Sequence, residues 1–177
     1  DELSWHVPAL WVIAGESLSV SAAAAAGADM TWIEPLPEAG SGGPLAPAVV
    51  QMEVTASAAA CREHGSSCGW KWPHVPGSRF MKEAMEVLPG LPARDVAAVL
   101  VESIVHADLV TTKGCSGVMT VVSPSVPVWN RESLARVAPL CRAVILSPEL
   151  TLPDIERLSA ARLPLATPPA LVVPVQG

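Results

Sequence analysis

The densest group of side chains that could bind a metal lies in one polar stretch, CREHGSSCGWKWPH. Its spacing, C-x2-H-x3-C-x5-H, is formed by Cys61, His64, Cys68 and His74. Thiolate and imidazole are the ligands that tetrahedral zinc prefers, and close spacing lets one loop surround the ion. The spacing differs from the familiar patterns that begin with C-x2-C. The stretch is therefore either a zinc-binding loop or an irregular surface loop with unconnected cysteines and histidines.

A second candidate for chemistry is Cys115, which is flanked by glycines in the sequence TTKGCSG and follows a predicted strand. Backbone N–H groups in such a turn can hold an anion, and the charge of Lys113 would favour a thiolate. A cysteine nucleophile also needs a base folded beside it, for which the candidates are His64, His74 and His106. The alternative is a thiol without a chemical role.

Two glutamates stand where predicted strands end. Glu149, in the sequence ILSPELTL, lies between a strand and a helix, and Glu34 ends the second predicted strand. Ligands bind at the carboxyl ends of parallel strands, so the two carboxylates could act there as an acid/base pair. The alternative for Glu149 is an interaction with the N-terminus of the following helix, which contributes roughly 0.3–1 kcal/mol.

Trp70 and Trp72 stand on either side of Lys71 in the same region. They could stack on a base or another ring, or they could cover an edge of the core. The sequence contains no G-x-G-x-x-G, P-loop or G-x-S-x-G motif, which would have indicated a nucleotide site or a serine nucleophile.

Apolar runs that alternate with helical segments predict a parallel α/β fold. At the N-terminus, a strand over 9–15, an alanine-rich helix over 16–28 and a strand over 29–35 predict a βαβ unit. Further strands are predicted over 117–123, 142–147 and 170–177, with helices over 130–140 and 152–161 that have Asn130 and Thr151 as N-caps. This alternation is typical of a parallel sheet covered by helices.

The rest of the chain has weaker patterns. Residues 35–92 are rich in Pro and Gly, which predicts an irregular middle insertion. Within it we expect a loop over 35–47, a strand running into a helix over 48–61, an irregular stretch over 62–78 and a helix over 79–88. A helix is predicted over 93–106 and a strand over 107–114. The chain 1–177 is predicted to be a single α/β domain or a fragment of one.

Composition narrows the class of protein. Half of the residues are apolar, and the net charge is −6 with a pI near 5.1. The 11 Lys and Arg residues are scattered, which argues against a general nucleic-acid surface. No apolar run reaches the roughly 18 residues that cross a bilayer, and no basic-then-apolar leader begins the chain. We expect a soluble cytoplasmic protein with reduced thiols. We also expect the chain to be a piece of a longer protein. Its partners are unknown, and a homo-oligomer is an open alternative.

The C-terminal segment CRAVILSPELTLPDIERLSAARLPLATPPALVVPVQG, residues 141–177, resembles the peptidase U32 family. The family shows an apolar strand, an x-E-L-[ST]-L-x-x-I segment, a helix and a strand that ends near V-x-V-H-G. The matching residues here are Glu149, Leu150, Thr151, Leu152, Ile155, Val173, Val175 and Gly177, and Gln176 replaces the family's histidine. Residues 126–140 and 14–34 resemble two other units of the family. The resemblance covers about half of the chain and leaves out 35–92.

Membership would imply a TIM-barrel-like (β/α) fold, here incomplete, and an activity at the C-terminal rim of the strands. The family's members are called collagenase-like peptidases, and several act in RNA or quinone hydroxylation with an iron–sulfur cluster. The cysteines that bind this cluster normally follow the segment that ends here at Gly177, so no cysteine of this chain takes that role by position. The alternative function is a non-catalytic α/β binding or scaffold module, with or without the loop zinc site.

Overall fold

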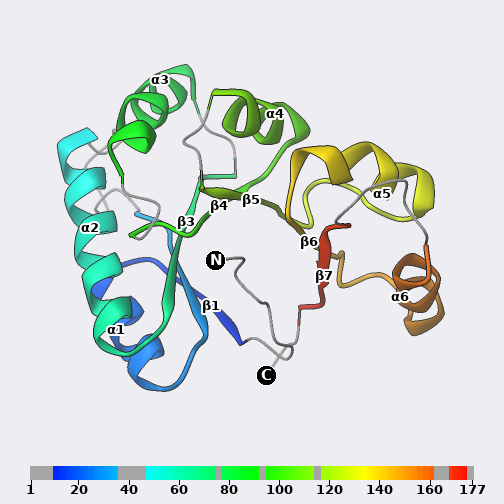
Figure 1. Ribbon diagram of the computed structural model, residues 1–177, viewed down its shortest axis with the longest axis horizontal. Coiled ribbons are helices and arrows are strands. Elements are labelled where there is room, and N and C mark those ends of the chain that lie inside the picture. Colours follow the sequence, from blue (N-terminus) through cyan, green and yellow to red (C-terminus); the bar gives the residue numbers. More distant parts are fainter. Residues whose placement is uncertain are drawn as a thin grey trace.

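The structure is a computed structural model that describes residues 10–35, 47–74, 77–91, 95–113, 117–161 and 168–174. Within them, one sheet contains seven parallel strands in the order in which they occur along the chain. The strands are β1 (Trp11–Ala14), β2 (Met30–Ile33), β3 (Ser67–Lys71), β4 (Ala98–Val101), β5 (Met119–Val122), β6 (Ala143–Ile145) and β7 (Ala170–Val172). Figure 1 shows the sheet curling into part of a barrel with the helices outside it. The predicted α/β class and its incomplete, parallel, TIM-barrel-like form are confirmed.

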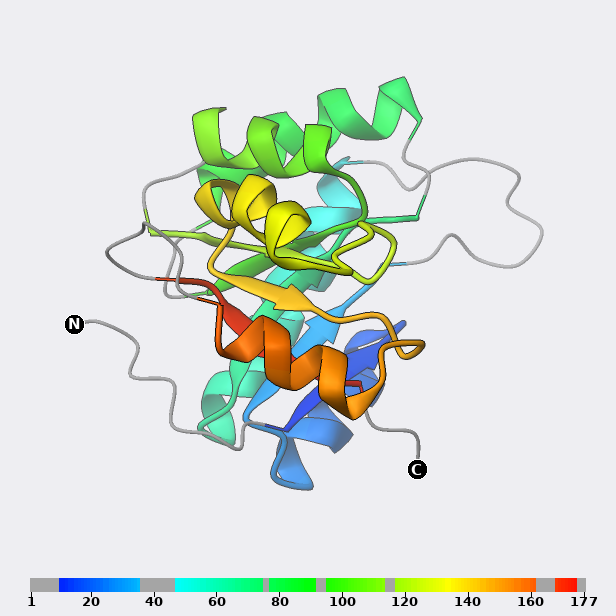
Figure 2. The same cartoon turned by 90° about the vertical axis from the view of Figure 1, so that its right-hand side faces the viewer.

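Helices connect the strands and cover the outer face of the sheet, as Figure 2 shows from the side. They are α1 (Ser17–Ala25), α2 (Pro47–Glu63), α3 (Ser78–Val87), α4 (Ile104–Lys113), α5 (Arg131–Val137) and α6 (Leu152–Ser159). The two predicted N-caps are confirmed. The Ser133 amide donates to Asn130 Oδ1 at 2.9 Å, and Thr151 forms a capping box with Asp154.

The prediction for 93–114 was wrong: the helix over 93–106 is replaced by strand β4, and the strand over 107–114 by helix α4. All four residues of β4 are buried, so this segment lacks the alternation that distinguishes a strand from a buried helix. The β-branched Thr111 and Thr112 suggested a strand. In α4, however, the Thr112 hydroxyl donates to the Asp108 carbonyl at 2.7 Å, and Thr111 donates to the Leu140 carbonyl at 2.9 Å.

The described part of the predicted irregular middle insertion is regular, although the helix predicted over 79–88 is present as α3; the loop predicted over 35–47 lies mostly outside the described residues. The described part of 35–92 contains α2, β3 and α3, which continue the regular β/α alternation. The strand expected at the start of 48–61 is part of α2. Strand β3 was missed because its sequence, SCGWK, mixes polar residues with a glycine and has few β-branched residues.

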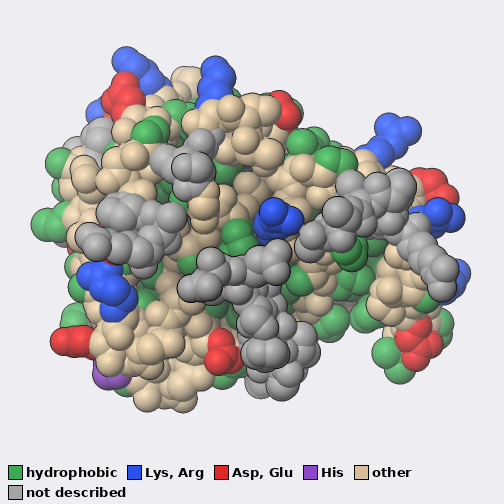
Figure 3. Space-filling model, in the orientation of Figure 1, with side chains coloured by type: hydrophobic (Ala, Val, Ile, Leu, Met, Phe, Trp, Pro, Cys, Tyr) green, Lys and Arg blue, Asp and Glu red, His purple; other side chains and the backbone are tan. Residues whose placement is uncertain are grey.

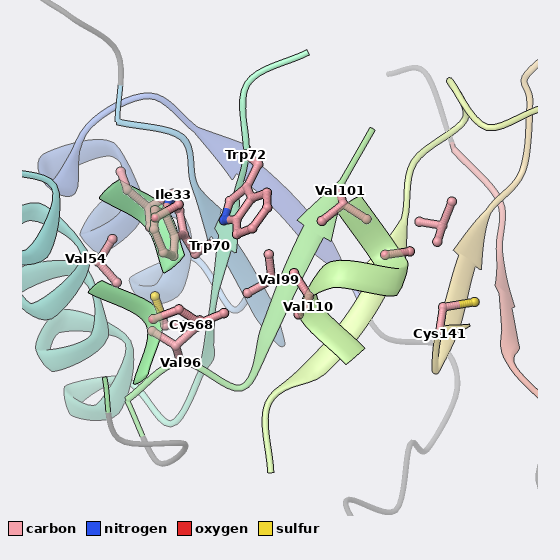
Figure 4. Close-up of a cluster of buried hydrophobic side chains, with 14 of the residues drawn as sticks. Ile33, Val54, Cys68, Trp70, Trp72, Val96, Val99, Val101, Val110 and Cys141 are labelled. Carbon is pink, nitrogen blue, oxygen red and sulfur yellow. The ribbon is translucent and has the colours of Figure 1, made fainter. Parts of the chain in front are cut away.

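Alternate residues of each strand point to opposite faces of the sheet, and a hydrophobic cluster lies on each face. The inner cluster contains Met30, Trp32, Ala98, Leu100, Val121 and Ala143. The larger outer cluster lies between the sheet and the helices, and Figure 4 shows Ile33, Trp70, Val99 and Val101 from the strands there, with Val54 and Val110 from the helices. A residue that follows the last inner residue of a strand by two positions therefore points to the inside of the barrel.

Trp70 and Trp72 belong to the outer cluster. Their side chains are almost completely buried, and they pack edge-on against each other and against Phe80 of α3, with ring centroids 5.8–6.3 Å apart. Of the two uses that the sequence left open, the structure shows the packing role, because a buried indole cannot stack on an external base.

No helix in the described ranges combines the length and the hydrophobicity needed to span a bilayer. On the face seen in Figure 3, Lys and Arg side chains lie apart from one another and are interspersed with acidic ones.

Candidate functional site

Polar side chains follow three neighbouring strands at the carboxyl end of the sheet. Glu34 comes directly after β2, Lys71 is the last residue of β3, and Glu102 comes directly after β4. Glu34 and Glu102 each follow an inner residue, Trp32 or Leu100, by two positions, so the strand period directs them inside the barrel. The register pairs Trp32 with Gly69, which brings Lys71 level with Glu34.

The ammonium group of Lys71 lies between the two carboxylates. Lys71 Nζ is 2.7 Å from Glu34 Oε2 and 3.6 Å from Glu102 Oε1. The side chains are only 13%, 20% and 7% exposed for Lys71, Glu34 and Glu102. Burying charges is costly unless they are paired, and the single ammonium group lies close enough to pair with both carboxylates.

Glu102 is the centre of a wider hydrogen-bond network. Its Oε2 accepts from Ser123 Oγ at 2.6 Å and from Ser125 Oγ at 2.5 Å, and it lies 3.2 Å from His74 Nδ1. Burial opposes ionisation of Glu102, but these hydrogen bonds and the charge of Lys71 outweigh it and lower the pKa of Glu102 below its ordinary value. Glu102 is therefore a fixed, ionised acceptor.

The lowered pKa of Glu102 makes the free energy of unfolding depend on pH in the acidic range, which can be tested. The pKa of Glu102 lies below its ordinary 4.5 in the folded chain, so its ionisation stabilises the fold above about pH 4.5, and this contribution is lost as the pH falls through the folded-state pKa. We expect Glu102→Gln to flatten the decline of the unfolding free energy below pH 4.5, measured by urea titration with tryptophan fluorescence. The exposed Glu86→Gln variant should keep the wild-type decline, and an equal flattening in both would contradict the role of Glu102.

The structure separates the four predicted zinc ligands. Cys61, at the end of α2, and Cys68, in β3, are neighbours in the buried core, whereas His64 is exposed in the turn after α2 and His74 lies beyond the other end of β3, beside Glu102. Among the described residues, no three His, Cys, Asp or Glu side chains are grouped as metal ligands. Strand β3 runs between Cys61 and His74, and it therefore keeps these two predicted ligands at opposite ends of the strand.

Cys61 and Cys68 are instead core residues. The pKa of the Cys68 thiol is raised by its hydrogen bond with Cys61 and by burial, so Cys68 stays a neutral thiol. Such a thiol packs as a small apolar side chain. Cys115, the predicted nucleophile, lies outside the described residues.

Of the two predicted catalytic glutamates, only Glu34 joins the cluster. Glu149 is exposed in the loop after β6, and its carboxylate makes no hydrogen bond or ion pair with a described residue. The N-terminus of α6 is capped by Thr151 and Asp154, so Glu149 is not its capping group. The acid/base role of Glu149 stays a prediction.

Sequence reasoning missed Lys71, Glu102, Ser123 and Ser125. Glu102 was hidden because β4 was taken for a helix, and Lys71 because β3 was not recognised. A local signal was present: in AVLVE and MTVVS, a polar residue directly follows a buried apolar run. In a parallel sheet, such residues from neighbouring strands meet at the same edge.

A parallel, curled β/α sheet with charged side chains at the carboxyl ends of its strands is the architecture of β/α-barrel enzymes. Comparison with solved structures agrees at the level of the fold. A U32 peptidase superposes with a TM-score of 0.67 at 13% identity, over 93% of this chain and 67% of that protein. This is fold-level support for the resemblance seen in the sequence.

Other β/α-barrel enzymes are similar as well. The 3,6-anhydro-D-galactonate cycloisomerase from Zobellia galactanivorans has a TM-score of 0.62 at 11% identity, over 95% of this chain and 46% of that one. A mandelate racemase/muconate lactonizing enzyme from Sulfitobacter has a TM-score of 0.52 at 9% identity, over 77% and 39%. The chain thus spans about two thirds of the U32 peptidase and less than half of the other two. No protein-family model and no curated protein sequence matches it.

Proposed function

We propose that this chain forms the substrate-binding rim of a U32-peptidase-like hydrolase that cleaves peptide bonds. The observation that carries the proposal is the Glu34–Lys71–Glu102 cluster at the carboxyl ends of three adjacent strands. Replacing a buried ion pair with apolar residues of similar volume is often neutral or stabilising, so stability alone does not account for charges at this position. Buried charges at the rim of a barrel therefore favour a role in chemistry.

Each member of the cluster can take a defined part in hydrolysis. Glu34 is the least buried of the three and, as a carboxylate, can accept a proton from the attacking water. The Lys71 ammonium can stabilise the negative charge that develops on the carbonyl oxygen. Glu102, saturated by its donors, holds Lys71 in position. Proton transfer and charge stabilisation support hydrolysis over the hydroxylation that the family resemblance also implies.

The test is cleavage of a defined mixture of unstructured peptides, with denatured collagen peptides included, and detection of new termini by mass spectrometry. We expect Glu34→Gln to lower the rate by about 10²-fold or more, because the amide keeps the shape but cannot accept the proton. Glu86→Gln, on the exposed face of α3, is the matched control and should keep the wild-type rate.

Two results would count against this proposal. A loss of activity in Glu149→Gln with none in Glu34→Gln would place the reaction at the loop after β6. No cleavage of any peptide by the wild-type chain, at protein concentrations where it is folded, would favour the non-catalytic binding or scaffold alternative.

A further inference from the structure

The imidazole of His74 contacts the network through one nitrogen only. His74 Nδ1 lies 3.2 Å from Glu102 Oε2 and 3.3 Å from Ser125 Oγ. The other ring nitrogen, Nε2, makes no hydrogen bond with a described residue, and the side chain is 72% exposed. The two nitrogens of this ring therefore have different surroundings.

The partners of Nδ1 decide which nitrogen carries the proton. Glu102 is ionised and can only accept, and the Ser125 hydroxyl already donates to Glu102 at 2.5 Å. Only a protonated Nδ1 makes a favourable contact with such a pair. Nδ1 thus holds a proton in both the neutral and the charged ring, and Nε2 is the nitrogen that gains and loses one.

This geometry differs from a Ser-His-acid triad. In a triad, the serine and the carboxylate contact opposite nitrogens of the ring, so that the imidazole can take the hydroxyl proton. Here Ser125 and Glu102 both contact Nδ1. Ser125 consequently helps to hold the ring and is not a nucleophile that His74 activates.

We propose that His74 is the proton donor to the leaving group of the hydrolysis, acting through Nε2 while Glu102 and Ser125 hold Nδ1–H. The inference rests on the proposed function. The Lys71 ammonium lies between Glu34 on one side and Glu102, with its partner His74, on the other. Glu34 and Glu102 follow the two strands that flank β3, so the carboxylate that takes a proton and the carboxylate that holds His74 lie on either side of the strand that carries Lys71.

The proposed step is balanced without an oxidant or a reductant. Glu34 removes a proton from water as the water oxygen forms its bond to the carbonyl carbon. The carbon–nitrogen bond then breaks as the Nε2 proton passes to the leaving nitrogen. Afterwards Glu34 releases its proton to solvent, and His74 takes one from solvent at Nε2.

The first test reads the tautomer and needs no activity. Long-range ¹H–¹⁵N correlation spectra of the ¹⁵N-histidine-labelled 177-residue chain should show neutral His74 protonated at Nδ1, with the signal assigned from a His74→Gln sample. In Glu102→Gln, the side-chain amide can donate to Nδ1, and we expect the population to move to the Nε2–H form. A wild-type ring protonated at Nε2 would overturn the inference.

The second test separates a proton donor from a structural residue. His74→Gln should slow cleavage of a peptide amide by about 10²-fold, because its leaving nitrogen needs a proton. It should leave cleavage of the corresponding 4-nitrophenyl ester nearly unchanged, because a nitrophenolate leaves without one. Equal losses on both substrates would overturn the role of His74. If the wild-type chain cleaves neither, the proposed hydrolysis fails, and the tautomer spectra still decide whether Nε2 is the exchanging nitrogen.

Discussion

Replacing Lys71 with methionine is expected to lower the free energy of unfolding by about 3 kcal/mol at pH 7, the scale on which an uncompensated buried charge destabilises a protein. Methionine has a similar length, so the change removes the charge and leaves the volume. Glu34 and Glu102 would then be two mostly buried carboxylates without the ammonium group that lies between them. Peptide cleavage should be lost together with the cation that stabilises the transition state.

Urea unfolding followed by tryptophan fluorescence measures this effect, and two controls separate charge from packing. The double variant Glu34→Gln/Lys71→Met removes the closest ion pair as a unit, so it should recover most of the lost stability but not the activity. The destabilisation by Lys71→Met should also shrink at acidic pH, because protonation of Glu102 removes negative charge that Lys71 compensates in the wild type. A loss that is the same in the double variant and at both pH values would show that packing, not charge, is responsible.

Replacing Gly69 with alanine is expected to cost about 3 kcal/mol of stability, at the upper end of the usual cost of overpacking a core. Gly69 lies in the middle of β3, directly beside Trp32 of β2. A Cβ atom at Gly69 would stand 2.3 Å from Trp32 Cε3, far inside van der Waals contact. The Trp32 ring cannot move away freely, because it is fully buried and packs against Trp11 with ring centroids 5.5 Å apart.

The measurement is again urea unfolding, with Gly90→Ala as the matched control. A Cβ at Gly90 meets no atom within 4 Å, and its backbone does not need a positive φ, so this variant should unfold like the wild type within about 0.5 kcal/mol. Since Trp32 lies one layer below the Glu34–Lys71 pair, Gly69→Ala should also reduce activity. Wild-type stability in Gly69→Ala would mean that Trp32 does not lie over Gly69.

Local patterns in the sequence were sufficient for the fold class and for much of its detail. Apolar runs that end at Gly15 and Glu34, with an alanine-rich segment between them, defined the first βαβ unit, because short apolar runs favour buried strands and alanine strongly favours helix. The caps at Asn130 and Thr151 could also be predicted, since a cap is a contact between residues three positions apart. The same local reasoning failed for β4, where burial on both faces removed the alternation, and for β3, whose sequence mixes polar residues with a glycine.

The candidate site was decided by the tertiary structure. Glu34 could be placed at a strand end, but its partner Lys71 and the central Glu102 lie 37 and 68 positions further along the chain. Only the parallel register of β2, β3 and β4 brings them to one edge. The same fold separates Cys61 from His74, which the sequence had offered as ligands of one candidate zinc site. Sequence patterns report contacts along the chain, whereas this site is built from contacts across the sheet.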